Sequence, residues 1–146
     1  MSEVAVQGYR EDLKKSFKSK MEANMARYYN FIHEWWSYEC REFEFKKIKR
    51  GTRYYKPDFY LLQKNRYIEI KGYFRRVDKI KLRRFKKFYP EEFSRLVFII
   101  PDKYAKSKAN GEMIAFLLDD LKVKFEDIES YEEIKKKFKY YISNWE

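Results

Sequence analysis

Hydrophobic residues near the N-terminus recur every three or four positions, which is the spacing of one face of an α-helix. The stripe comprises Leu13, Phe17, Met21, Met25 or Tyr28, Ile32 and Trp35. This period predicts a helix over about residues 11–36. Ser16 and Ser19 lie inside this stretch, and either residue is suited to cap or break a helix.

Three segments with the pattern of β-strands follow. Residues 38–48 alternate between aromatic and charged side chains, residues 54–62 are rich in aromatics, and residues 66–71 are followed by a glycine. Short turns separate the segments, and Pro57 interrupts the second one early. Because the connections are short, we expect an antiparallel meander.

Residues 77–89 are predicted to form a helix with four inward-facing side chains: Val77, Ile80, Phe85 and Phe88. Residues 96–100 are uninterruptedly apolar, which is typical of a strand that is covered on both faces and has a parallel partner. Further helices are predicted at residues 112–121 and 131–142. We therefore expect an α/β (α+β) fold, a mixed sheet flanked by helices, in a single domain of residues 1–146.

Composition narrows the classes of protein. The net charge of +11 favours a polyanionic partner, although a Lys-rich solubilising surface or a thermophile's ion pairs would also produce it. His33 and Cys40 are the single histidine and cysteine, which excludes zinc sites built on several such residues. No apolar stretch is long enough to span a bilayer, and no secretory signal is recognisable. We expect a cytoplasmic protein without a membrane partner.

The candidate chemistry lies on two of the predicted strands. Asp58 lies on one strand and Glu69 on the next, and Lys71 shares a face with Glu69 because strand side chains alternate. Ile68 and Ile70 point to the opposite face. Two converging carboxylates repel each other unless they share a proton or a cation, and oxygen ligands suit Mg²⁺ or Mn²⁺. The alternative is an exposed Glu–Lys pair and an aspartate in a turn.

These residues resemble a known nuclease motif. Pro57-Asp58 and Glu69-Ile70-Lys71 resemble the pattern of the PD-(D/E)xK nuclease superfamily, whose fold is the restriction-endonuclease-like αβββαβ core. Residues 55–59 and 69–72 further resemble the phage endonuclease I family of Holliday-junction resolvases. Asp78 and Lys81, near the start of the following helix, extend that resemblance, which covers about residues 19–125.

The resemblance implies an Mg²⁺-dependent endonuclease that hydrolyses phosphodiester bonds in branched DNA, with Mn²⁺ able to substitute. Asp58, Glu69 and the Ile70 carbonyl would hold one ion, and Lys71 would orient the attacking water. Glu22 would join Asp58 at a second ion, and whether one or two ions bind is left open. Glu22 also fits a plain capping box with Ser19. A homodimer is implied, and a host cytoplasm if the protein is viral.

A basic face follows the motif directly. Its predicted DNA contacts are Arg75, Arg76, Lys79, Lys81, Arg83, Arg84, Lys86 and Lys87. The alternative is an ordinary solvated helix face. A second basic run, residues 135–139, has no such neighbour, and we expect it to face solvent.

Two other functions remain open at this point. One is a nuclease of the same fold that acts on duplex DNA, of the restriction, nicking or transposition type. The other is a non-catalytic DNA-binding or packaging protein, which would gain nothing from two carboxylates placed near phosphate.

Overall fold

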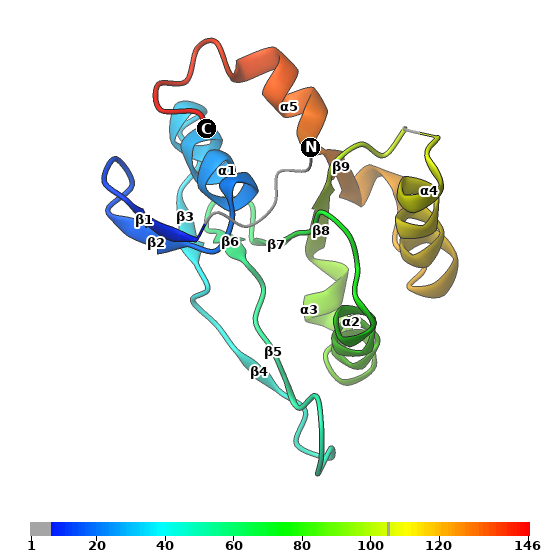
Figure 1. Cartoon of the computed structure of the whole chain (residues 1–146). Coiled ribbons are helices and arrows are strands. Elements are labelled where there is room, and N and C mark those ends of the chain that lie inside the picture. The colour runs from blue at the N-terminus through cyan, green and yellow to red at the C-terminus, as the bar shows by residue number, and fades with distance from the viewer. Residues whose placement is uncertain (1–6, 105) are drawn as a thin grey trace.

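A five-stranded sheet forms the centre of the computed structural model, which describes residues 7–104 and 106–146 (Figure 1). The strand order is β3-β6-β7-β8-β9. The bounds are β3 (Trp36–Tyr38), β6 (Phe59–Leu61), β7 (Arg66–Ile70), β8 (Leu96–Ile100) and β9 (Ile128–Ser130). The first three strands pair antiparallel and the last three parallel. The expected mixed sheet and the parallel strand β8 are confirmed. The antiparallel meander is present as β3-β6-β7, although its first strand covers Trp36–Tyr38 rather than residues 38–48. The strand β9 was not predicted.

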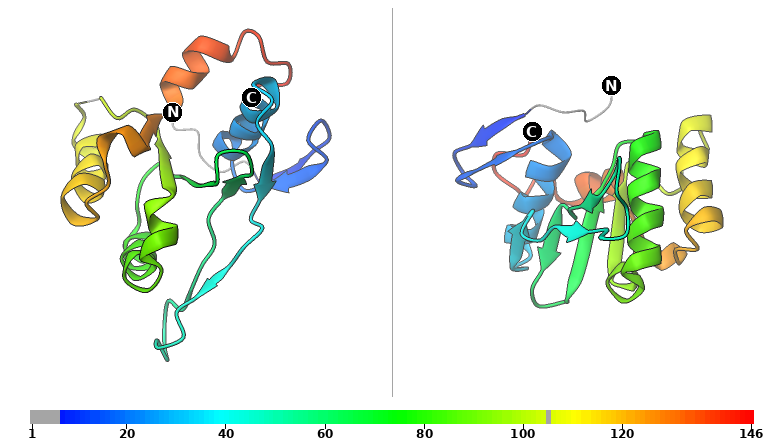
Figure 2. Two further views of the ribbon diagram at one scale, coloured as in Figure 1. Left: turned by 180° about the vertical axis from the view of Figure 1, so that it is seen from behind. Right: turned by 90° about the horizontal axis from the view of Figure 1, so that it is seen from below.

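Helices cover both faces of this sheet (Figure 2). One face packs against α1 (Lys20–Phe31) and α5 (Tyr131–Phe138), and the other packs against α2 (Arg76–Phe88) and α4 (Lys108–Ala115). Alternate residues of β7 enter the two cores: Ile68 joins the α1 side and Tyr67 the α2 side. The alternation therefore also places Glu69 on the α2 side.

The predicted N-terminal helix is too long at both ends, because α1 stops at Phe31 with Trp36 already in β3, and residues 11–19 are not helical. There the chain forms an antiparallel hairpin of β1 (Gly8–Arg10) and β2 (Lys15–Phe17). Ser19 has an extended backbone with φ −154°, and its Oγ accepts a hydrogen bond from the Glu22 N–H at 3.1 Å. This cap starts α1 at Lys20. Phe17 is still buried, but from a strand rather than from a helix.

The first and second predicted strands, residues 38–48 and 54–62, belong only in part to the central sheet. β4 (Phe43–Glu44) and β5 (Tyr54–Tyr55) pair with each other outside the central sheet. With the loop between them they form a hairpin that projects away from the sheet, and residues 43–55 are called the arm below (Figure 1). Pro57 lies between β5 and β6, where its missing N–H ends the ladder.

The remaining helices follow the prediction with shifted ends. α2 occurs as expected, and Leu82 and Phe85 are its most buried apolar side chains. It is followed by α3 (Pro90–Ser94). The helix expected over residues 112–121 is α4 continued by a π-helical segment, η1 (Phe116–Asp120), and a 3-10 turn, η2 (Phe125–Asp127), precedes β9. Within the described parts of the chain, no helix has the length and apolar character needed to cross a bilayer.

Candidate active site

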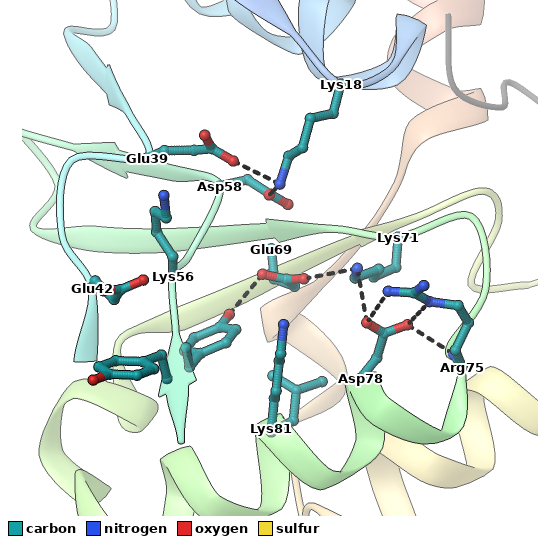
Figure 3. Close-up of a pocket in the computed structure, with 13 residues that line it drawn as sticks. Lys18, Glu39, Glu42, Lys56, Asp58, Glu69, Lys71, Arg75, Asp78 and Lys81 are labelled. Atoms are coloured by element: carbon teal, nitrogen blue, oxygen red, sulfur yellow. Dashed lines mark hydrogen bonds and ion pairs between the residues drawn. The ribbon is translucent and has the colours of Figure 1, made fainter. Parts of the chain in front are cut away.

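A cavity of about 400 Å³ opens between the sheet, the base of the arm and α2 (Figure 3). Charged side chains dominate its lining. The lining residues are Lys18, Glu39, Glu42, Tyr54, Tyr55, Lys56, Asp58, Glu69, Lys71, Arg75, Asp78, Lys81 and Leu82. All three residues that the sequence placed at the chemical centre, Asp58, Glu69 and Lys71, are among them.

The strand register brings the two predicted acids together. Phe59 pairs with Ile68 across β6 and β7, so one step along the antiparallel pair places Asp58 opposite Glu69. Both side chains are nearly inaccessible, each residue being 4% exposed. The Oδ2 of Asp58 accepts a hydrogen bond from the Ile70 N–H at 2.7 Å. Because the N–H and C=O of one strand residue point to the same side, the Ile70 carbonyl also faces Asp58.

Burial makes both carboxylates costly to ionise. It raises the pKa of Asp58 well above its usual value of 3.8, and the nearby charges of Glu69 and Glu22 raise it further. Burial also raises the pKa of Glu69, against the lowering effect of Lys71 and of a hydrogen bond from the Tyr55 hydroxyl. A pair of this kind gains stability by binding a proton or a cation.

Lys71 is held beside this pair by two acids. Its Nζ lies 3.7 Å from Glu69 Oε2 and 3.2 Å from Asp78 Oδ1. Burial alone would lower the pKa of Lys71, but Glu69, Asp78 and Asp58 outweigh it and raise that pKa, so the side chain stays an ammonium ion. It points into the cavity next to Glu69 (Figure 3).

Asp78 is fixed by the start of α2. Its Oδ2 accepts a hydrogen bond from the Arg75 N–H at 2.8 Å, and the Arg75 side chain also donates to it. Burial tends to raise the pKa of Asp78, but the bonds from Arg75 and the charge of Lys71 lower it. From the sequence, Asp78 had no predicted role beyond its part in the family resemblance. Its position three residues after the helix cap was the available signal.

A second lysine reaches the acids from the N-terminal hairpin. Lys18 follows β2, and its Nζ lies 2.6 Å from Glu39 Oε2 and 3.8 Å from Asp58 Oδ1. Burial tends to lower the pKa of Lys18, but the hydrogen bond that its ammonium group donates to Glu39 and the charge of Asp58 outweigh burial and raise that pKa. Neither Lys18 nor Glu39 was predicted, because no local pattern links them to residues far along the chain.

Glu22 lies at the edge of the site. It is 5% exposed, and its Oε1 accepts hydrogen bonds from the Lys18 N–H at 3.0 Å and from the Tyr38 hydroxyl at 2.7 Å. It therefore contacts the backbone just before α1, as a capping residue would. Its charge also acts on Asp58 and Glu69, although it does not line the cavity.

The basic residues predicted to contact DNA divide into groups. Arg75 and Lys81 line the cavity. Three others have partners within the protein: Arg83 pairs with Asp120, Arg84 donates to the Thr52 carbonyl and Lys86 donates to the Leu121 carbonyl. Of the rest, Arg76 and Lys87 are exposed and Lys79 lies over the ring of Phe116. DNA contact by this face remains a prediction.

The donors at the centre of the cavity are oxygens. Asp58 and Glu69 supply carboxylates, and the Ile70 carbonyl faces the same side, which is the donor chemistry that Mg²⁺ and Mn²⁺ prefer. Within residues 7–104 and 106–146, no three His, Cys, Asp or Glu side chains are already gathered as a metal-binding group. Comparison with family models, with curated proteins and with solved structures found no match.

Proposed function

We propose that this chain is a divalent-metal-dependent DNA endonuclease. The observation that carries the proposal is the pair of buried carboxylates, Asp58 and Glu69, which lie opposite each other with raised pKa values and share a cavity with Lys71. A protein that only bound DNA would be weakened by two acids at this point. The same pair is useful where a cation has to be held against a phosphate.

The order of elements supports a restriction-endonuclease-like core. The succession α1-β3-β6-β7-α2-β8 has the expected order αβββαβ, and the arm is an insertion between the first two strands. Asp58 precedes the second of these strands, and Glu69 and Lys71 lie at the end of the third. This is the relation that the motif requires.

The residues present fit a magnesium or manganese ion. Asp58 and Glu69 would hold it with the Ile70 carbonyl, and Glu22 would approach a second ion only after releasing Lys18 or Tyr38. When bound, such an ion polarises the scissile phosphate and lowers the pKa of the attacking water. The raised pKa values of the two acids provide an independent reason for the site to take up a cation.

The protein's own groups have separate roles around that ion. The ammonium group of Lys71 orients the attacking water and offsets the negative charge that develops on the phosphate. Asp78 positions Lys71, and the Tyr55 hydroxyl orients Glu69 by donating to its Oε1 at 2.7 Å. Lys18 lowers the cost of ionising Asp58 from 3.8 Å, and Glu39 holds the Lys18 ammonium group in that position at 2.6 Å.

For the substrate we propose branched DNA, cut as by a junction resolvase, with the chain acting as a homodimer. A two-fold pair of identical sites is suited to symmetric cuts in two strands. The net charge of +11 and the basic side chains that line the cavity, among them Arg75 and Lys81, favour a polyanion.

A cleavage assay tests this proposal. Four-way junction, flap and linear duplex substrates are incubated with the protein in Mg²⁺, in Mn²⁺ or in EDTA. We expect cleavage that requires the metal and is fastest on the junction. Faster cleavage of linear duplex would contradict the resolvase and indicate a restriction- or nicking-type enzyme. Binding without a metal-dependent product at any protein concentration would favour the non-catalytic protein and refute the enzyme.

Removal of the Tyr55 hydroxyl is expected to weaken metal binding. Tyr55→Phe leaves the buried ring in place but deletes the hydrogen bond that lowers the pKa of Glu69. Loss of such a supporting bond costs about 10–100-fold in metal affinity or activity. The Mg²⁺ concentration for half-maximal cleavage should rise by about tenfold or more. Tyr60→Phe is the matched control, because the Tyr60 hydroxyl binds Asn65 instead. Equal behaviour of the two variants would contradict the role given to Tyr55.

A further inference from the structure

The tip of the arm concentrates positive charge. Residues 46–53 contain five basic side chains and no acidic one: Lys46, Lys47, Lys49, Arg50 and Arg53. All five are exposed, and none of them has an ion pair among the residues that the structure describes. Like charges held this close repel one another, which destabilises the folded arm. A bound polyanion would relieve this repulsion.

The arm is held firmly in spite of its projection. Phe43, Phe45 and Tyr55 are at most 4% exposed, and they pack on aromatic side chains of α2 and its C-terminal cap. The Tyr89 hydroxyl donates to the Glu44 carbonyl at 2.7 Å, and Arg84 donates to the carbonyl of Thr52 in the loop. A surface fixed in this way loses little conformational entropy when a partner binds.

The base of the arm is also a wall of the candidate active site. Tyr54 and Lys56 line the cavity, and the chain between Lys56 and the tip at Arg50 is continuous with them. Six residues span at most about 20 Å when extended, which corresponds to about six base pairs of duplex DNA. Gly51, with φ +74°, allows the narrow turn at the tip, so the basic end of the arm can project away from the cavity.

We propose that the arm binds the phosphate backbone of duplex DNA up to about six base pairs from the phosphate held in the cavity. The location of the held phosphate rests on the proposed function, whereas the binding of duplex DNA by the arm does not. Lys47, Lys49 and Arg50 are the central contacts. They act as counterions for the backbone and take no part in the chemistry.

Binding at different salt concentrations tests the proposal without any cleavage. Lys47, Lys49 and Arg50 are each replaced by Gln, and the control replaces Lys136, Lys137 and Lys139 by Gln. The control removes the same charge from α5 and the residue after it, at the far end of the molecule from the arm (Figures 1 and 2). Affinity for a duplex of about 30 base pairs is measured in EDTA, and circular dichroism melts establish that both variants are folded. Each lost phosphate contact lowers the magnitude of the slope of log K against log salt by about 0.9.

In the arm variant, we expect the magnitude of that slope to fall by about 2–3 and the affinity near 0.1 M salt to fall at least about tenfold. In the control variant, the magnitude of the slope should fall by less than about 1. Equal slopes for the two variants would refute the role of the arm. Cleavage is scored separately, so an inactive protein that binds through its arm would refute the proposed enzyme alone.

Discussion

Asp58→Asn is expected to abolish metal-dependent cleavage and, at the same time, to stabilise the metal-free protein. The amide oxygen of Asn can still accept the hydrogen bond from the Ile70 N–H, so the local structure is retained. The amide cannot supply the negative charge that holds the ion. Cleavage should fall by about 10³-fold or more, which corresponds to about 4 kcal/mol of lost transition-state stabilisation.

The gain in stability has a separate cause. Asp58 is 4% exposed, and ionising it there is unfavourable, so a neutral side chain removes a cost of about 1–3 kcal/mol. For a chain of this size, each kcal/mol raises the midpoint of thermal unfolding by about 2–4 °C. Melting is measured with and without Mg²⁺. The ion should stabilise the unmodified protein and leave the variant unchanged. A variant that is less stable in EDTA would contradict the strain assigned to this carboxylate.

The pH dependence follows from the raised pKa of Asp58. Above its usual value of 3.8, the folded protein holds this proton while the unfolded chain releases it. The free energy of unfolding therefore falls as the pH rises through the folded-state pKa. Asp78, with a lowered pKa, acts in the opposite direction but only at more acidic pH. In EDTA, the melting midpoint should fall as the pH rises above the usual aspartate value of 3.8 towards the raised pKa of Asp58, and it should fall less in the Asn variant.

Lys71→Ala is expected to reduce turnover by about 10²–10³-fold with little change in DNA affinity. The ammonium group lies within 4 Å of Glu69 and Asp78, at the position from which it offsets charge on a phosphate. Single-turnover rates at saturating DNA measure the chemical step, and binding in EDTA measures affinity. Lys81→Ala is the matched control, because it removes the same charge from another wall of the cavity. Its effect should appear in affinity rather than in turnover. Equal effects of the two variants would remove the special role of Lys71.

The central part of the site could be predicted because it depends on local geometry. Side-chain alternation along one strand decides that Glu69 and Lys71 share a face, and a short hairpin brings Asp58 opposite Glu69. Both relations are visible over fifteen residues of sequence. The buried strand β8 was equally predictable, because its five apolar residues have no polar interruption.

The parts that could not be predicted depend on contacts between distant segments. Lys18 reaches Asp58 from a hairpin forty positions earlier, and no pattern around either residue indicates this. The N-terminal helix was extended too far because Leu13 and Phe17 have a spacing of four, which a strand-turn-strand segment can also produce. The start of α1 is instead set by the cap at Ser19, whose Oγ accepts a hydrogen bond from the Glu22 N–H. The strands of the arm were assigned to the central sheet because their sequence has the pattern of paired strands. They do pair, but only with each other.

Along β7, the alternation of side chains decides which residues face the cavity and which enter the core on the other face of the sheet. Tyr67 enters the core on the α2 side and Glu69 faces the cavity, whereas Ile68 and Ile70 enter the opposite core. Deleting one residue within the strand would exchange the two sets, burying a carboxylate among isoleucines and presenting hydrocarbon to the substrate. This chain can therefore accept added or lost residues in the exposed turn of its arm around Gly51 far more readily than in the five positions from Arg66 to Ile70.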